Sequence, residues 1–217
     1  MPKMFFNKNI KNFRISNKTQ KRNHLSKLNV DFVITKKFDR KFSKTKSIDF
    51  IQKVLKKKLN AKFIFVSNNF RFGNKREGDV NQLINYEKKC HFKIIKPKPL
   101  LIKKKIVSST LIRKYLQMGK LFKANKILNR SWSIEGKVQR GKQLGKKIGF
   151  PTANIDIKDY ILACPGVYAV RAKMNKGSKY IKGIANLGYR PTFNGKKILL
   201  EVHLFNFSGN LYNKYLT

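Results

Sequence analysis

The chain has 217 residues, with 51 lysines and arginines against 10 aspartates and glutamates, so its formal net charge is +41. Hydrophobic residues make up 41% of it, which excludes a disordered basic tail because such tails lack the apolar side chains that offset ordering entropy. The two cysteines, Cys90 and Cys164, are isolated in the sequence. They exclude a disulfide scaffold and a cysteine-only zinc site, and they favour a reducing, cytoplasmic location. No stretch approaches the roughly 20 apolar residues of a membrane helix.

The net charge has two interpretations. It could mark a polyanionic partner such as RNA or an anionic surface. It could also be compositional bias, because the lysines are spread along the whole chain rather than gathered in one stripe. We favour bias, so we expect no specific nucleic acid and no membrane among the partners. Some non-specific RNA binding at low salt follows in either case, because phosphate neutralisation is independent of sequence.

The first half alternates between strand and helix patterns. Residues 31–34, 62–66 and 92–95 are short apolar runs, typical of buried strands. Residues 47–55 and 80–89 carry apolar side chains at helical spacing. This order predicts an open parallel α/β sheet of the Rossmann-like kind.

Two further helices are predicted over residues 108–118 and 121–128, the first ended by Gly119. After Asn129 glycines cluster and short alternating runs recur, as at residues 167–172 and 199–205. That pattern is typical of an antiparallel barrel or sandwich. We therefore predict two domains, 1–128 and 129–217, and an α/β plus β fold class.

The segment from Gly136 to Ile155 is rich in glycine and lysine and ends in Pro151, Thr152, Ala153 and Asn154. Glycines allow a backbone to approach a phosphate closely. If the end of the segment is extended, the hydroxyl of Thr152 and the amide of Asn154 point the same way, and such oxygen ligands suit Mg²⁺. The alternative is a structural turn in which Asn154 bonds to backbone.

Glu201 lies in an apolar run from Leu199 to Leu204, where acidic residues are otherwise scarce. On a strand it shares one face with His203, while Leu200, Val202 and Leu204 face the other way. Such a carboxylate could act as a general base toward a substrate hydroxyl. The alternative is an exposed barrel face. His203 is not expected to bind metal, because no second ligand lies at motif spacing.

Four ordered blocks carry a resemblance to riboflavin kinase over residue 130 to the end. They are the glycine-rich segment ending in Pro-Thr-Ala-Asn, Pro165-Gly166-Val167-Tyr168, Gly183-Ile184-Ala185-Asn186-Leu187-Gly188, and Leu200-Glu201-Val202-His203. The upstream half resembles the adenylyltransferase domain of the bacterial bifunctional riboflavin kinase/FAD synthetase. Its blocks are Asn69-Phe70-Arg71-Phe72-Gly73 and Val107-Ser108-Ser109-Thr110-Leu111-Ile112-Arg113.

The resemblance implies a function in flavin cofactor synthesis, namely ATP-dependent phosphorylation of riboflavin to FMN. Glu201 falls on the catalytic base, and Thr152 and Asn154 fall on the Mg·ATP positions. The ligand would lie between the loop 141–154 and the strand that bears Glu201. The implied phosphate-side loop includes Gly141, Lys142, Gly145 and Gly149.

The other implied site is the adenylyltransferase motif that converts FMN to FAD. Ser108, Ser109, Thr110 and Arg113 fall on it. There, hydroxyls, a helix N-terminus and an arginine would hold ATP phosphates.

The sequence departs from the family pattern at both ends. It has no His-x-Gly-His motif, and Ser67, Asn68 and Asn69 stand where the family has Gly-x-Asp. The family also continues past Thr217 with a further strand and helix. We therefore expect a chain truncated at both ends, a degenerate adenylyltransferase half, and an unclosed six-stranded-type barrel with exposed edges. The competing hypothesis is a non-catalytic basic module that binds RNA or an anionic surface.

Overall fold

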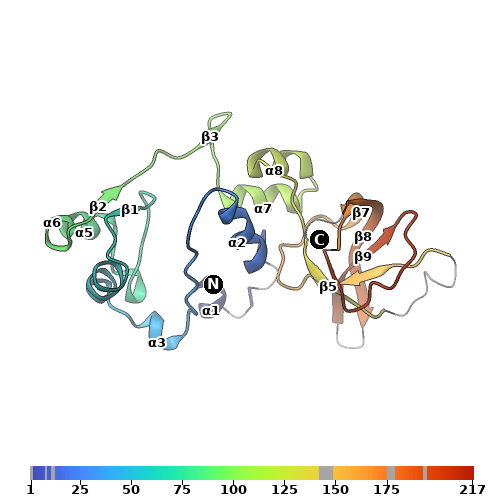
Figure 1. The fold of residues 1–217 in the computed structure, drawn as a ribbon, viewed down its shortest axis with the longest axis horizontal. Helices are drawn as coiled ribbons and strands as arrows, with labels where there is room; N and C mark the ends of the chain where they lie inside the picture. The colour runs from blue at the N-terminus through green and yellow to red at the C-terminus, as the bar shows by residue number, and fades with distance from the viewer. Residues whose placement is uncertain (1, 8, 11–12, 142–148, 175–178, 193–194) are drawn as a thin grey trace. The chain divides into compact units, whose positions relative to one another are not determined.

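The computed structural model describes residues 2–7, 9–10, 13–141, 149–174, 179–192 and 195–217, with the backbone alone for residues 3, 190–192 and 195–197. The chain divides into two compact units. The α/β unit comprises residues 1–8 and 34–106, and the six-stranded unit comprises residues 9–33 and 107–217. Figure 1 shows the chain as a ribbon coloured from the N-terminus to the C-terminus.

The α/β unit is built on one parallel pair of strands, β1 (Phe63–Phe65) and β2 (Lys93–Ile95). The connection between them contains a 3-10 helix and two short α-helices, so the chain forms a crossover from one parallel strand to the next. Its core includes Ile51 and Leu83, both fully buried. The remaining elements of this unit are α1 (Pro2–Phe6), α3 (Arg40–Ser43), α4 (Ser47–Asp49), the π-helix η1 (Phe50–Lys58), η2 (Asn74–Arg76), α5 (Val80–Asn85), α6 (Glu87–Cys90), β3 (Leu101–Ile102) and β4 (Lys105–Ile106).

One predicted strand of the α/β sheet is wrong. Residues 31–34 have no strand pairing in the described chain, and Phe32 and Ile34 are 87% and 73% exposed. An apolar run forms a buried strand only where a partner strand and a covering layer meet it. The parallel sheet therefore has two strands within the described residues. Phe63 and Phe65 on β1 are also exposed, so that strand is not buried on both faces as predicted.

The six-stranded unit contains an antiparallel sheet in the order β10-β5-β6-β9-β8-β7. Its longest strands, β8 and β9, pair over ten registered positions, and β7, β8 and β9 lie side by side in Figure 1. The strands are β5 (Gly136–Gln139), β6 (Ala153–Ile155), β7 (Gly166–Ala172), β8 (Ile181–Thr192), β9 (Gly195–Leu204) and β10 (Tyr215–Leu216).

Side chains alternate between the two faces of this sheet. Val138 on β5, Ala153 and Ile155 on β6, and Leu200 and Val202 on β9 are buried in one core. Because successive residues of a strand face opposite ways, the residues between them lie on the other face of the sheet. The predicted antiparallel β architecture is confirmed.

The two outer strands of the sheet, β7 and β10, are joined at one end. Lys173, directly after β7, exchanges two backbone hydrogen bonds with Thr217, directly after β10, at 2.9 and 3.0 Å. Such a reciprocal pair is the unit of an antiparallel ladder. The expectation that the sheet stays open along both edges is therefore wrong at this end.

The segment 9–33 packs with the six-stranded unit. The sequence pattern groups this segment with the α/β elements, in the predicted domain 1–128. The backbone of Arg14 forms an isolated parallel β-bridge with that of Tyr160. The Trp132 indole N–H donates to the Ile15 carbonyl at 2.8 Å. The helix α2 (Lys18–Ser26) follows, with Asn17 as its N-cap. These contacts tie the segment to the residues that lead into the sheet.

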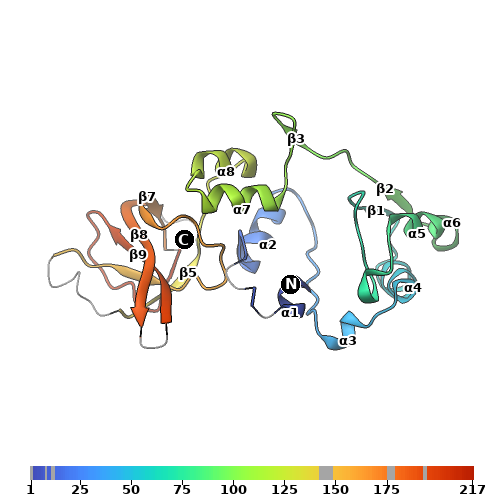
Figure 2. The same ribbon diagram turned by 180° about the vertical axis from the view of Figure 1, so that it is seen from behind.

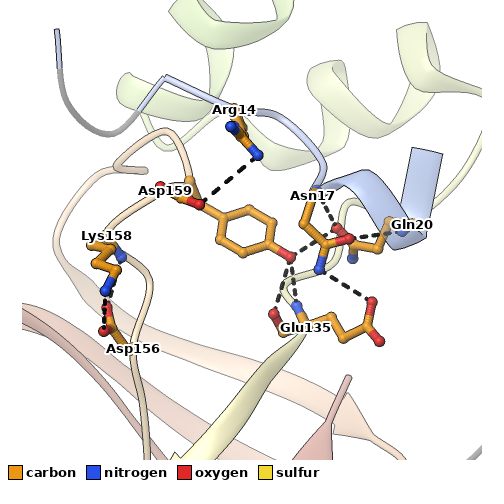
Figure 3. A network of polar contacts seen from close by, with 8 residues as sticks. Arg14, Asn17, Gln20, Glu135, Asp156, Lys158 and Asp159 are labelled. Carbon is orange, nitrogen blue, oxygen red and sulfur yellow. Dashed lines mark hydrogen bonds and ion pairs between the residues drawn. The ribbon is translucent and has the colours of Figure 1, made fainter. Parts of the chain in front are cut away.

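A buried tyrosine organises this attachment (Figure 3). The Tyr160 hydroxyl accepts from the Glu135 N–H at 3.0 Å and lies 2.9 Å from the Gln20 side-chain oxygen. The Gln20 amide in turn donates to Ser133, and the Asn17 amide to the Glu135 carboxylate. Burial raises the pKa of Tyr160 to about 12, so the neutral phenol holds this network together.

Helices α7 (Ser109–Gln117) and α8 (Leu121–Leu128) also belong to the six-stranded unit, and they lie beside each other in both views (Figures 1 and 2). Ile112, Leu116 and Ala124 are buried in the same core as the sheet residues. Packing thus divides the chain near residue 106, whereas the boundary predicted from composition lies at 128/129 and stays a prediction. Among the described residues, no helix is long and apolar enough to cross a membrane.

Candidate functional site

Four polar side chains form one row across the outer face of the sheet. In the strand register, Gln139 pairs with Asn154, Asn154 with Glu201, and Glu201 with Asn186. Residues directly opposite each other on antiparallel strands have side chains on the same face, about 5 Å apart at Cβ. The row therefore joins four strands, β5, β6, β9 and β8, with the predicted base Glu201 between two asparagines.

Asn154 is the most buried member of this row, with 6% of its surface exposed. Its Oδ1 is buried and has no hydrogen-bond partner among the described residues. A buried acceptor without a partner costs free energy, so such an atom points to a ligand that completes it. The alternative that Asn154 serves a turn by bonding backbone receives no support from these contacts.

Gly141 lies directly against the Asn154 amide. A Cβ on residue 141 would come within 2.2 Å of Asn154 Nδ2 and 2.9 Å of its Cγ. A side chain at residue 141 would force the Asn154 amide to shift, so glycine lets the backbone at this position lie directly against the amide. Gly149 has a φ of +81°, a left-handed backbone conformation that residues with a side chain rarely adopt.

Thr152 is half-buried and lies directly before β6, two residues from Asn154. Its neighbour Pro151 accepts a hydrogen bond from His203 Nδ1 at 2.9 Å. The chain therefore stays alongside β9 beyond the end of the β6 ladder. An open groove of about 410 Å³ adjoins this point, lined in part by Gly149, Pro151 and His203.

The structure thus brings together Gly141, Thr152, Asn154 and Glu201 at one end of the sheet, next to the groove that Gly149 helps to line. Lys142 and Gly145, also predicted for the phosphate-side loop, lie outside the described residues. Among the described residues, no three His, Cys, Asp or Glu side chains gather as a metal cluster. The oxygen set at this site is instead a hydroxyl, an amide and one carboxylate, which are ligand types that suit a hard cation.

The predicted adenylyltransferase residues lie on α7. Ser108 is its N-cap and accepts from the Leu111 N–H at 3.2 Å. The Arg113 guanidinium donates to the Phe13 carbonyl and to the Ser109 hydroxyl, and it stacks 3.7 Å from the Phe13 ring. Partial burial lowers the pKa of Arg113 from its usual value. Thr110 is exposed. Arg113 is therefore engaged in packing the segment 9–33, and Ser109 is exposed and accepts from Arg113 within the same helix.

The second block that resembles the adenylyltransferase lies in the other unit. Asn69, Phe70, Arg71 and Asp79 help to line an open groove of about 390 Å³ in the α/β unit. Arg71 forms an ion pair with Asp79 at 3.4 Å. The two sets of predicted adenylyltransferase residues thus belong to different compact units.

Two features of the site were not predicted from the sequence. Asn186 lies opposite Glu201, and His203 hydrogen-bonds to Pro151. The pairing register that sets Asn186 beside Glu201 depends on contacts between distant strands. The hydrogen bond of His203 joins residues 52 positions apart in the sequence, so the spacing of neighbouring residues could not predict it.

Comparison with known protein families matches both halves of the chain. The riboflavin kinase family matches residues 128–217, and the FAD synthetase family matches residues 1–111. A bifunctional riboflavin kinase/FMN adenylyltransferase of Buchnera aphidicola from Schizaphis graminum is 40% identical over 216 residues, 98% of this chain and 69% of the relative. The Escherichia coli K12 enzyme of the same name is 36% identical over 94% of this chain and 64% of its own length.

A solved structure gives the same picture for the fold. The chain superposes with a TM-score of 0.78 on a crystal structure titled as a macrolide-efflux protein from Streptococcus pneumoniae, at 26% identity over 93% of this chain and 64% of that one. This likeness shows the fold. The two matched families and the relatives that align over nearly the whole chain lead to one conclusion: this chain belongs to the bifunctional riboflavin kinase/FMN adenylyltransferase family of flavin cofactor synthesis.

Proposed function

We propose that this chain phosphorylates riboflavin to FMN with Mg·ATP at the row of polar residues on the six-stranded sheet, and that its adenylyltransferase half is degenerate. The observation that carries the proposal is the register of Asn154 opposite Glu201, with a buried Asn154 oxygen that lacks a partner in the described chain. A ligand that brings a cation to this oxygen would complete it beside the carboxylate.

In this proposal Glu201 is the general base. It takes the proton from the 5′-hydroxyl of riboflavin while that oxygen attacks the γ-phosphorus of ATP, and ADP leaves. Its half-buried position next to Asn154 supports the role, because the base must lie close to the group that orients the phosphates. The neighbouring Asn186 completes the polar surroundings of the carboxylate.

Mg²⁺ is the metal that these residues fit. The Asn154 Oδ1 and the Thr152 hydroxyl would hold it, since two protein oxygens together with phosphate oxygens make the coordination that Mg²⁺ prefers. When bound, the ion neutralises charge on the β- and γ-phosphates. The loop from Gly141 to Gly149 would bring backbone N–H groups to the same phosphates, and Gly141 supports this by fitting closely over the Asn154 amide.

The finer fold assignments belong to the same proposal. The six-stranded unit is a riboflavin kinase-like barrel, supported by its strand order and by the joined edges. The α/β unit is a partial Rossmann-like nucleotidyltransferase domain, supported by its parallel strand pair. A cytoplasmic location is supported by the two free cysteines and by the use of ATP.

The test is an incubation of the chain with riboflavin, ATP and Mg²⁺, with products separated by chromatography. We expect FMN to form and to require Mg²⁺, with ADP released in equal amount. A parallel incubation with FMN and ATP should give no FAD above background. Absence of FMN formation at any substrate concentration would contradict the proposal, and FAD formation would contradict the degenerate half.

A further inference from the structure

The side chain of His203 is anchored at the edge of the site, two residues from Glu201 on β9. Its Nδ1 lies 2.9 Å from the Pro151 carbonyl oxygen. A carbonyl only accepts, so Nδ1 carries the proton and donates it. The imidazole is also edge-on to two phenylalanine rings, Phe150 at 5.5 Å and Phe205 at 5.8 Å between centroids. One hydrogen bond and two aromatic contacts therefore hold the ring.

The backbone that His203 holds has no other attachment to β9 in the strand register. The β6–β9 ladder begins at Ala153, opposite Val202. Pro151 has no N–H and cannot donate to a ladder. The hydrogen bond from His203 therefore attaches the chain to β9 at Pro151, two residues before the ladder begins at Ala153. Thr152 lies between these two points of attachment.

We propose that His203 is a positioning residue for the kinase reaction, which fixes the Pro151–Thr152 backbone so that the Thr152 hydroxyl is presented to Mg·ATP. The inference rests on the proposed function. Glu201 is positioned separately, by the ladder with Asn154 and Asn186. Loss of the His203 contact should therefore weaken the nucleotide site while the base keeps its place.

Two variants separate the hydrogen bond from the ring. His203→Asn keeps a donor near the Nδ1 position and removes the ring, whereas His203→Phe keeps an aromatic ring and removes the donor. We expect the KM for Mg·ATP to rise about tenfold in His203→Phe and less than about threefold in His203→Asn, with kcat and the KM for riboflavin nearly unchanged in both. Thermal unfolding checks that both variants are folded.

A second measurement does not depend on turnover. Amide hydrogen exchange of the peptide that contains residues 151–155, followed in the free protein, should be faster in His203→Phe than in the wild type and in His203→Asn. If exchange behaves this way but the wild type makes no FMN, the proposed function fails while the anchoring role stands. Wild-type exchange and wild-type KM in His203→Phe would overturn the inference, and so would a His203→Asn variant as impaired as His203→Phe.

Discussion

The two predicted sites are distributed differently over the two compact units of this chain: the predicted kinase residues lie within one unit, whereas the predicted adenylyltransferase residues are divided between both. In the six-stranded unit, Asn154 and Glu201 lie on neighbouring strands in direct register. The predicted adenylyltransferase residues are divided between the units: the groove beside Arg71 lies in the α/β unit, while Ser109 and Arg113 belong to the six-stranded unit, where Arg113 donates to the Phe13 carbonyl. A site on adjacent strands is fixed by the ladder itself.

The difference shows what holds a catalytic arrangement together. The β6–β9 and β8–β9 ladders set the separation of the polar row through backbone hydrogen bonds, so the site needs no further support to keep its spacing. In the α/β unit, the corresponding parallel ladder joins only β1 and β2, each three residues long. The following predictions test whether the flavin chemistry depends on the first arrangement alone.

The largest effect is expected from Glu201→Gln. Removal of the base should lower kcat for FMN formation by about 10²–10⁴-fold, with little change in the KM for Mg·ATP. The matched control is Glu87→Gln in the α/β unit, where the side chain accepts a hydrogen bond from the Ile94 N–H that glutamine can also accept. We expect the control to retain wild-type activity. Equal FMN formation by wild type and Glu201→Gln would show that the base assignment is wrong.

Gly141→Ala should come next. The new methyl group would meet the Asn154 amide at 2.2 Å, so the loop or the amide must shift. We expect kcat/KM for Mg·ATP to fall about 10- to 100-fold, because small displacements of a positioning group are costly. Gly188→Ala serves as the control, since a Cβ there has an ordinary contact, 4.0 Å from Asn186 Oδ1. Steady-state kinetics of both alanine variants will show whether crowding at Asn154 matters.

Thr152→Ala should have a smaller and more selective effect. Loss of one hydroxyl ligand should raise the KM for Mg·ATP about tenfold, leaving the KM for riboflavin unchanged. Thr152→Ser keeps the hydroxyl and should restore most of the affinity. Titration of Mg·ATP by calorimetry measures this directly, and an unchanged affinity in the alanine variant would count against the metal assignment.

Tyr160→Phe should change stability and leave the kinase reaction intact. The variant loses the hydroxyl that bonds the Glu135 N–H and meets Gln20, which should cost about 1–3 kcal/mol of unfolding free energy. Denaturant unfolding of variant and wild type gives this difference, and FMN formation at neutral pH should be the same in both.

The same variant gives a pH test. Burial raises the pKa of Tyr160 in the folded state to about 12 from its usual 10.0, so the folded state keeps the phenolic proton where the unfolded chain has lost it. This contribution to stability is full below pH 10 and is lost as pH rises toward 12. The gap between wild type and Tyr160→Phe should therefore narrow over that range. A gap that stays constant would mean that the phenol is not protected.

The prediction of fold from sequence succeeded where alternation and burial agree. Residues 200–204 alternate between apolar and polar side chains, and they form the end of β9 with Leu200, Val202 and Leu204 buried. The prediction failed at residues 31–34, where an apolar run alone could not show whether a partner strand would meet it. Closure of the sheet through Lys173 and Thr217 was also missed, because two isolated backbone hydrogen bonds have no side-chain pattern.

The candidate site was foreseeable in part for the same reason. Thr152, Asn154 and Glu201 could be singled out by residue type and by the resemblance to riboflavin kinase, and Glu201 also because the chain has only 10 acidic residues. The distances between these residues could not be predicted from the sequence, because strand register is set by long-range pairing. The close fit of Gly141 over Asn154 is of this kind: its glycine looked like any other in a glycine-rich loop.

The alternation of the six-stranded sheet has a practical consequence. Its inner face carries the apolar residues that hold the fold, and its outer face carries the polar row, so the two can be altered independently. A chain with Glu201 replaced by glutamine should therefore remain folded and still accept both substrates without consuming them. Such an inert variant is the natural material for crystallising a stalled ternary complex, in which the nucleotide and the vitamin could be seen together.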